Sequence, residues 1–515
     1  MVVLKASRRL VIGGCAALAI LAGGVPALAA PVQGGDLVAT QDIEIASLDP
    51  LFGSAVGYDR SALNLFYENL YILDAEGEFV PRLATGWQIA EDGLSITFNL
   101  REGVTFSDGT PFDAAAVKAN IDRVVALQGE SRAATQASAI SGAEVVDDMT
   151  VKINLARQSG SILSILASES AMMVSPAAMD DREALRRNPA GTGPFLLEDW
   201  QGGFQLKAVK NPDYWRKDDA GNALPYLDSV TLRFIADTSV AIVEAQSGAA
   251  HIADRIQSRD FDRVEAMEGL TLNPRPSQIT QFLVFNNSGE PFAENEKLRK
   301  AVRAAIDPAR VESVVSRGRG RVNPTWVPHT SWEYTEDLDT PSYDPELAKR
   351  LYAESGHEGP LTMSIIQRDP DTQIAQIVQA LLAQADIPME IEVLEREAWL
   401  DKTRGRRHEI AMLRSTAPLA DPDIRFSGYY LPESGGNYSA IQDDALIGMV
   451  KAAEAETDFD ARKAQYKDIQ QRLLDKAYEV YLFARPAAEV LREEVKGFDT
   501  ELVNSWRLEE VYLEQ

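Results

Sequence analysis

Cysteine is confined to one position near the start of the chain. Cys15 is the sole cysteine among 515 residues, so all that follows it must be held by packing and hydrogen bonds, without disulfides or thiolate metal sites. A long chain can do this because large domains bury most of the surface that their unfolded chains expose. With 45% hydrophobic and 25% charged residues, the composition is that of a globular protein.

The first 29 residues have the pattern of a secretory signal peptide. A cationic opening precedes an apolar stretch from Leu10 to Leu21, and Ala27-Leu28-Ala29 follows as a small-residue cleavage site. The apolar stretch is too short for a comfortable membrane span. We therefore expect export to the periplasm with cleavage near Ala29, by the general secretory route or by the twin-arginine route that Arg8-Arg9 also fits. Lipid attachment at Cys15 is a weaker alternative.

Charge and missing motifs exclude several classes of function. Cleavage after Ala29 removes three bases and no acids, so the remaining 486 residues carry 48 basic and 78 acidic side chains, a charge of −30. This charge disfavours nucleic acid as a partner. The few histidines have no zinc-protease spacing, and the chain has no Gly-x-Ser-x-Gly, Ser-x-x-Lys or Gly-Lys sequence. We therefore expect no metal, nucleotide or organic cofactor. An exported hydrolase using Asp421 and Asp423 stays open as one candidate.

Short alternating segments and helical segments intermix without a fixed repeat, which predicts a mixed α/β architecture. Strands are predicted at residues 36–43, 94–100, 204–209, 230–235 and 281–285, with a final apolar strand at 480–483. Helices are predicted at 61–70, at 113–127 behind the cap residue Asp113, at 238–247 before Gly248, and at 458–474. No linker rich in Pro, Gly or Ser separates two halves, so we expect domains joined by crossover strands.

A series of ordered phrases runs through the chain after the signal. The phrases are Leu48-Asp49-Pro50, Tyr67-Glu68-Asn69-Leu70, Pro81-Arg82-Leu83-Ala84, Asp108-Gly109-Thr110-Pro111-Phe112, Gly191-Thr192-Gly193-Pro194-Phe195, Asn211-Pro212-Asp213-Tyr214-Trp215 and Leu298-Arg299-Lys300-Ala301-Val302. Taken singly, they are scaffold features: Asp108-Gly109-Thr110-Pro111 indicates a tight turn, and Gly191-Thr192-Gly193-Pro194 a close backbone crossing. Together, over residues 36–500, they resemble the extracytoplasmic solute-binding proteins of peptide and nickel ABC importers, of the dipeptide-binding and oligopeptide-binding type.

The resemblance implies a two-lobed periplasmic binding protein fold with mixed sheets, an extra N-terminal subdomain and a hinge of crossover strands. Lobe I would comprise residues 30–277, with the subdomain at about 58–187, and lobe II residues 278–490. Residues 491–515 would return to lobe I, and 278–285 and 480–490 would be the two crossings. Such a protein, expected as a monomer, would capture a small peptide-like, opine-like or oligosaccharide solute and deliver it to an inner-membrane ABC permease.

The resemblance also suggests residues that contact the solute. In dipeptide binders an arginine in a Gln-Arg segment holds the peptide carboxylate, and Gln367-Arg368 resembles that segment. A guanidinium suits this task because it pairs with a carboxylate through two hydrogen bonds. Alternatively, Arg368 pairs with Asp369 or Asp371 on the surface. Further solute contacts are expected from Ser54 and Ala55.

The segment from His408 to Asp423 aligns without a gap with the dipeptide-binding pattern, and it supplies the remaining expected contacts: Ser415, Thr416, Ala417, Pro418 and Asp421. Ser415 stands where dipeptide binders have Trp, and Pro418 stands where they have the Asp that takes the peptide's amino terminus. Proline has no side-chain acceptor and no N–H. We therefore predict that this protein is not a general dipeptide receptor. Asp421 or Glu409 could replace the lost acid only if the loop followed a different path.

A histidine and three tyrosines near this segment could either pack in the protein or contact a ligand. His408 is expected to pack or to contact solvent and not to bind a metal. The aromatic rings of Tyr429, Tyr430 and Tyr438 could stack on a sugar, or they could pack beneath the loop.

Overall fold

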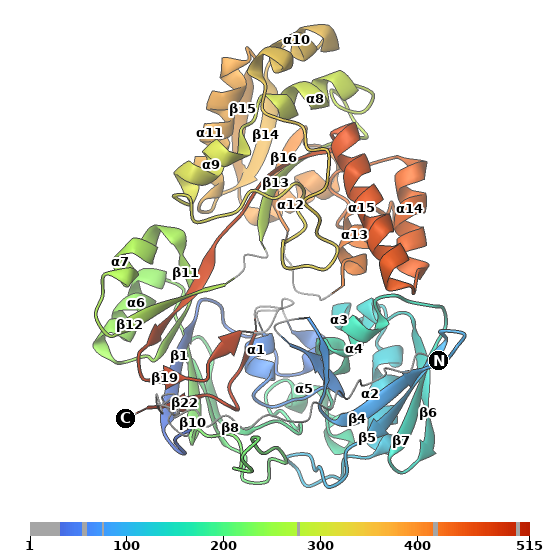
Figure 1. Ribbon diagram of the computed structural model, residues 1–515, viewed down its shortest axis with the longest axis vertical. Coiled ribbons are helices and arrows are strands. Elements are labelled where there is room, and N and C mark those ends of the chain that lie inside the picture. The colour runs from blue at the N-terminus through green and yellow to red at the C-terminus, as the bar shows by residue number, and fades with distance from the viewer. Residues whose placement is uncertain are drawn as a thin grey trace, which may run out of the picture.

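The structure is a computed structural model, and it describes residues 31–53, 59–74, 77–275, 279–415, 421–500 and 505–514. Figure 1 shows one sheet with its helices in the upper part of the molecule and two sheets side by side in the lower part. We call the described residues 279–484 the upper lobe, and the described residues 31–275 and 487–514 the lower lobe. Each sheet is named after one of its strands.

The β1 sheet of the lower lobe is mixed. Its seven described strands run in the order β12 (Leu270–Arg275), β18 (Ala487–Arg492), β11 (Ile252–Gln257), β1 (Asp36–Gln41), β10 (Ser229–Phe234), β9 (Gln205–Lys210) and β8 (Phe195–Gln201). Strand β1 is parallel to both β10 and β11, and the other neighbours are antiparallel. The strands predicted at 36–43, 204–209 and 230–235 are thus confirmed.

The β5 sheet of the lower lobe is antiparallel, in the order β4 (Ala84–Ile89), β5 (Ser95–Leu100), β7 (Thr150–Leu155) and β6 (Ile140–Asp147). Its core contains Phe98, Ile121 and Val151, all fully buried. Three helices pack on this core: α2 (Ala114–Ala126), α3 (Arg132–Gln136) and α4 (Ile162–Leu166). The strand predicted at 94–100 is confirmed as β5.

Short elements complete the described part of the lower lobe. The helices are α1 (Arg60–Leu63), α5 (Arg182–Leu185), α6 (Thr238–Ser247) and α7 (Phe261–Glu265), and the 3₁₀ turns are η1 (Pro50–Phe52), η2 (Glu169–Ala171), η3 (Pro176–Ala178) and η4 (Ser258–Asp260). Three strand pairs are β2 (Tyr71–Leu73) with β3 (Phe79–Pro81), β19 (Val495–Lys496) with β22 (Tyr512–Leu513), and β20 (Asp499–Thr500) with β21 (Trp506–Arg507).

The β13 sheet forms the centre of the upper lobe, in the order β15 (Met389–Leu394), β14 (Leu361–Ile366), β16 (Ile410–Arg414), β13 (Thr280–Phe285) and β17 (Glu479–Ala484). One face packs in a cluster with α8 (Glu296–Ala304), α9 (Pro308–Val315), α10 (Pro345–Ser355) and α11 (Asp371–Gln384). The other face packs with α12 (Arg396–Arg404), α13 (Asp423–Tyr430), α14 (Asp444–Ala455) and α15 (Phe459–Lys476). Because both faces are covered, β13 is buried at every position.

Two neighbouring segments carry the chain between the lobes. Strand β13 follows β12 of the lower lobe, and β17 of the upper lobe leads into β18 of the lower lobe. The N–H of Arg485 donates to the carbonyl of Ile279, at 2.9 Å, so the segments lie side by side. The strand predicted at 480–483 is confirmed as β17, but it is not the final strand. The chain changes sheets at 485–486, earlier than the boundary at 490 expected from the sequence, because β18 already pairs with β11 and β12.

Helix ends follow the capping residues of the sequence. The Asp113 carboxylate accepts from the Ala116 N–H at the start of α2, and the Asp458 carboxylate accepts from the Ala461 N–H at the start of α15. Gly248 closes α6 with a left-handed backbone at φ 83°. Gly109 takes a positive φ of 84° in the predicted turn before α2. The predicted helices at 113–127, 238–247 and 458–474 are therefore confirmed.

The helix predicted at 61–70 is wrong beyond its first turn, since α1 ends at Leu63. The N–H groups of residues 65–67 still donate back to Ala62 and Leu63, but the carbonyls that would continue the helix accept from distant segments. The carbonyls of Leu65 and Phe66 accept from Phe195 and Gly193, both at 2.9 Å. A Cβ on Gly193 would lie 2.4 Å from the carbonyl carbon of Phe66, so the backbones cross closely there, as the Gly-Thr-Gly-Pro phrase predicts.

Several of the ordered phrases meet at one buried carboxylate. Glu68 accepts hydrogen bonds from Thr192 Oγ1 at 3.0 Å, Tyr214 OH at 2.9 Å and Trp215 Nε1 at 2.8 Å. Burial raises the pKa of Glu68, while the donors Trp215 and Tyr214 oppose the shift. These phrases are thus a polar core that fixes how segments far apart in sequence pack in the lower lobe.

Candidate functional site

Arg368 lies in the loop between β14 and α11, at the end of the upper lobe from which the chain crosses to the lower lobe. Its Nε donates to Asp371 Oδ2 at 2.7 Å, and Asp371 is fully buried. Arg414, at the end of β16, donates to the other oxygen, Asp371 Oδ1, also at 2.7 Å. Two guanidinium groups therefore share one carboxylate, and this cluster keeps a net positive charge.

The pairing of Arg368 leaves part of its guanidinium unused. Asp371, one of the two surface partners expected from the sequence, occupies Nε, while Nη1 and Nη2 make no hydrogen bond to the described residues. The side chain is 34% exposed. Asp371 thus fixes the orientation of the guanidinium without covering the edge that would bind a carboxylate.

Ser415 is held by the crossover strand. Its Oγ accepts from the Thr280 N–H at 3.0 Å, and its own N–H donates to the Thr280 carbonyl at 2.9 Å. The residue is fully buried. Ser415, directly after β16, is therefore tied to β13. Four further expected contact residues, Ser54, Ala55, Thr416 and Ala417, lie outside the described residues, as does Pro418.

Asp421 is bound within the upper lobe. Arg462 on α15 donates to both of its carboxylate oxygens, from Nη1 and Nη2 at 2.6 Å, and both side chains are buried. Asp421 Oδ1 also accepts from the Asp423 N–H at the start of α13. Glu409, the other acid considered from the sequence, accepts from the Thr362 N–H at 2.6 Å. Both acids thus already have partners inside the upper lobe.

Two buried charges near Asp421 were missed by reading the sequence. Arg425 on α13 has two guanidinium nitrogens, Nε and Nη1, that lack a hydrogen-bond partner among the described residues, and the same holds for Glu333 Oε1. Burial raises the pKa of Glu333 to about 7, against the opposing charge of Arg425. The sequence does contain one sign that Arg425 is buried: it stands between the apolar residues Ile424 and Phe426.

The aromatic residues of the upper lobe pack against one another. The ring of Tyr429 lies 5.3 Å from that of Trp326, and Tyr430 is buried with its OH donating to Glu479 at 2.9 Å. Tyr438 packs on Trp399 at 5.6 Å. Of the two alternatives for these tyrosines, the structure therefore supports packing. His408 is buried as well, and burial lowers its pKa to about 4, so it is neutral at ordinary pH.

Ion pairs connect the lobes on the side of α7. Arg319 of the upper lobe lies 2.8 Å from Asp262 and 2.8 Å from Glu265, both on α7 of the lower lobe. Arg259, just before α7, lies 3.2 Å from Asp369, which follows Arg368. All of these side chains are exposed by more than a third, so each pair alone adds little stability. Asp369 thus contacts the lower lobe, and Arg368 is the residue directly before it.

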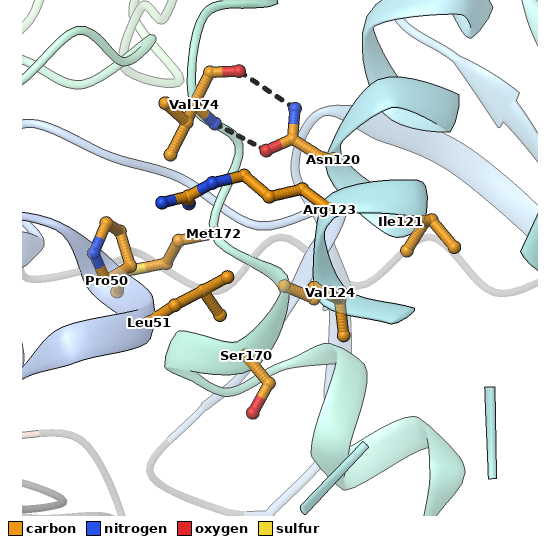
Figure 2. Close-up of a pocket in the computed structure, with 10 residues that line it drawn as sticks. Pro50, Leu51, Asn120, Ile121, Arg123, Val124, Ser170, Met172 and Val174 are labelled. Atoms are coloured by element: carbon orange, nitrogen blue, oxygen red, sulfur yellow. Dashed lines mark hydrogen bonds between the residues drawn. The ribbon is translucent and has the colours of Figure 1, made fainter. Parts of the chain in front are cut away.

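Two cavities differ greatly in size. A cavity of about 480 Å³ lies beside the crossover and is lined from both lobes, among others by Phe261, Arg275, Arg319 and His329. The other, of about 10 Å³, lies next to α2 in the lower lobe, where Asn120 makes two hydrogen bonds to the backbone of Val174 (Figure 2). The second has room for about one water molecule and not for a solute.

Within the described ranges, no helix is both long and apolar enough to span a bilayer. The same residues include no group of three or more His, Cys, Asp or Glu side chains placed to hold a metal ion.

The two lobes and the paired segments that join them define a class: a two-lobed solute-binding protein. Comparison with known proteins specifies the family. The sequence model of the bacterial extracellular solute-binding proteins, family 5, matches residues 78–437, and the chain belongs to this family. It is the solute-binding component of an ABC importer.

Similar proteins agree with this assignment. The dipeptide-binding protein of Escherichia coli (strain K12) is 27% identical over 521 residues, which cover 95% of this chain and 96% of that protein. The glutathione-binding protein GsiB of Salmonella paratyphi A is 32% identical over 374 residues, 72% of this chain and 71% of that protein. The structure of the periplasmic binding protein DppA from Helicobacter pylori, in complex with the peptide STSA, matches with a TM-score of 0.77 and 26% identity, covering 94% and 99%. All three are named as binding proteins, and DppA is named as an ABC transporter-associated one.

Proposed function

We propose that this protein captures a small carboxylate-bearing solute that lacks a free α-amino group, between its two lobes, and hands it to an inner-membrane permease. The sequence observation that carries the proposal is Pro418, which the resemblance aligns with the acid that holds the amino terminus in dipeptide binders. A buried ammonium without a carboxylate partner would be strongly penalised. Asp421 and Glu409 are already paired within the upper lobe, which makes compensation by either one less favourable.

The solute-binding residues follow from the same argument. Arg368 would bind the solute carboxylate through Nη1 and Nη2, because Asp371 occupies only Nε. Ser54, Ala55, Thr416, Ala417 and Pro418 would line the space around the solute. Ser415 and Asp421, first expected as direct contacts, would instead hold the loop through Thr280 and Arg462.

The proposed solutes are a narrower chemical class than the solutes of the family as a whole. The two named relatives bind, by their names, dipeptides and glutathione, which favours a peptide-like scaffold. Opine-like acids and acidic oligosaccharides also offer a carboxylate without a free α-amino group. We expect no cofactor and no catalysis. A hydrolase would need an available carboxyl group, whereas Asp421 is ion-paired and Asp423 is hydrogen-bonded.

The path of the chain supports a hinge at the crossover. The proposed rigid bodies are the lower lobe, built on the β1 and β5 sheets, and the upper lobe, built on the β13 sheet, with the hinge at Ile279 and at residues 485–486. We further propose that residues 1–29 are a cleaved signal peptide, by either export route, and that the mature protein is monomeric in the periplasm.

A thermal-shift screen tests the proposed solute class. The mature protein would be heated with dipeptides, their N-acetylated forms, opines, acidic and neutral oligosaccharides, and nickel chelates. A solute at a hundred times its dissociation constant stabilises the protein by about 2.7 kcal/mol. We expect selective stabilisation by acids without a free α-amino group, returned chemically unchanged. Broad stabilisation by unrelated free dipeptides would contradict the proposal.

A further inference from the structure

We propose that residues 157–161 of the lower lobe are a latch that docks on the start of α13 in the upper lobe, and that this latch sets solute affinity without touching the solute. The inference rests on the proposed function, because a latch between lobes matters only if the lobes close on a solute. The segment joins β7 to α4, and Figure 1 shows α4 directly below α13, on the side of the molecule opposite to α7.

The centre of the latch is a buried hydrogen bond between the lobes. Ser161 Oγ donates to Asp423 Oδ2 at 2.9 Å, and both residues are buried. Ser159 Oγ lies 3.1 Å from Ser161 Oγ, and Ser427 Oγ donates to Asp423 Oδ1 at 2.9 Å. This bond is shielded from water, unlike the exposed ion pairs near α7, and it is therefore stronger than they are.

Apolar and backbone contacts extend the latch. Ile424, the residue after Asp423, packs against the core of the β5 sheet in the other lobe. A Cβ on Gly160 would lie 2.6 Å from the Glu456 carbonyl and 2.7 Å from the guanidinium of Arg462, both in the upper lobe. Gly160 does not have a left-handed backbone. A side chain there would therefore obstruct the contact between the lobes without straining the loop itself.

Charge makes the latch sensitive to pH. Asp423 is faced by Asp421, by Glu454 at the end of α14 and by Arg462 on α15, and Glu454 is paired across the contact with Arg157 at 2.7 Å. Burial, together with the charges of Asp421 and Glu454, raises the pKa of Asp423 to about 6.

The sign of the pH effect follows from exposure. When the lobes separate, Asp423 meets water and its pKa falls toward the ordinary value. A carboxyl whose pKa is higher in the docked state favours docking at low pH, and this contribution is lost as the pH rises through about 6. The latch should therefore hold more tightly at about pH 5 than at about pH 7.5.

The experiment measures the distance between the lobes and needs no solute. Spin labels at Lys118→Cys on α2 and Lys467→Cys on α15 report this distance, and the mature chain has no other cysteine. Both lysines are partly exposed and lie outside the latch. We expect Ser161→Ala to reduce the short-distance population by about tenfold, because it removes one hydrogen bond to a charged group. We expect a reduction of about tenfold for Gly160→Val as well, because its side chain obstructs the contact between the lobes.

Two further variants distinguish a pH-sensitive latch from a contact that only supports the fold. Asp423→Asn keeps the shape and should keep the short distance, but it should remove the pH dependence seen in the parent protein. Arg259→Gln, which breaks the exposed pair with Asp369 and a longer pair with Asp260 of its own lobe, should leave the distribution unchanged. Circular dichroism would confirm that each variant is folded.

The latch would be overturned if folded Gly160→Val and Ser161→Ala variants kept the parent distance distribution, or if the pH dependence persisted in Asp423→Asn. Because no solute is used, such a failure would leave the proposed solute class standing. Conversely, a failed solute screen together with the expected distance changes would reject the solute class and not the latch.

Discussion

Charged side chains in the upper lobe differ in how many of their hydrogen-bonding atoms are already used in ion pairs. Asp421 uses both oxygens on Arg462, whereas Arg368 uses only Nε on Asp371. Arg414 shares Asp371, so the cluster of two arginines and one carboxylate remains positive. At residue scale, the site therefore favours an anionic group on the solute and offers no unpaired acid, among the described candidates, for an ammonium.

Replacing Arg368 tests this charge preference. In Arg368→Ala, the carboxylate of a captured solute would be desolvated without a partner, so binding of an acid found in the screen should weaken by about 2 to 5 kcal/mol. Calorimetry on the mature protein measures the change. Arg396→Ala is the matched control, since that exposed arginine pairs only with exposed Glu397 among the described residues. If Arg368→Ala weakened binding by less than about 1 kcal/mol, Arg368 would be a surface ion-pair residue and not a solute contact.

A buried acid near the C-terminal segment makes a second prediction at residue scale. Glu509 is buried and lies 2.8 Å from Arg216 and 3.6 Å from Arg82. Burial would raise its pKa, but the charges of Arg82, Arg507 and Arg216 outweigh this and lower it. A carboxyl with a lowered pKa stabilises the fold above its unfolded value of about 4.3, and this contribution is lost as the pH falls further.

We therefore expect Glu509→Gln to lower the free energy of unfolding by about 3 kcal/mol near neutral pH, because it leaves the largely buried Arg82 without its ion-pair partner, while Arg216 keeps only Glu510. The difference from the parent protein should shrink below about pH 4. Urea unfolding at several pH values measures it. The neighbouring Glu510→Gln is the control, since Glu510 is 55% exposed and pairs with the same Arg216. Equal effects of the two substitutions would contradict the argument.

At the scale of elements, local sequence patterns predicted most of the helices and strands that we expected from the sequence. Helices α2, α6 and α15 begin and end where their caps indicate, since cap and periodicity are properties of a few neighbouring residues. The helix predicted at 61–70 failed because Leu65 and Phe66 hydrogen-bond to residues 193–195, a contact that no local pattern encodes. Arg368 was predicted from a family phrase. The buried surroundings of Arg425 and Glu333, and the Ser161–Asp423 pair, could not be predicted, because the residues that meet there are distant in sequence.

The crossing at Gly193 can be tested directly. In Gly193→Ala the new methyl group would lie 2.4 Å from the Phe66 backbone, which cannot move aside as a flexible side chain could. Overpacking of this kind costs about 1 to 3 kcal/mol of unfolding free energy. Gly86→Ala in β4 is the control, since its methyl group would meet no atom within 4 Å. Thermal and urea unfolding should show a clear loss only for Gly193→Ala, and a stable Gly193→Ala protein would refute the close crossing.

At the scale of the whole molecule, contacts flank the region between the lobes on two sides. Exposed ion pairs of Arg319 lie on the side of α7, and the buried Ser161–Asp423 bond lies on the side of α4 (Figure 1). The two chain segments at Ile279 and Arg485 run between the lobes. Such an arrangement allows the lobes to move about a few residues while each stays rigid. A solute shifts this equilibrium only through its different affinity for the closed and open forms.

Small-angle X-ray scattering of the mature protein, with and without the best solute of the screen, tests most directly whether the lobes close on a solute. The account predicts a smaller radius of gyration in the complex, because a solute held by Arg368 and by the lower lobe favours the closed form. Gly160→Val should show a smaller decrease than the parent protein, since its side chain obstructs the contact between the lobes. An unchanged radius of gyration with saturating solute would contradict capture between the lobes.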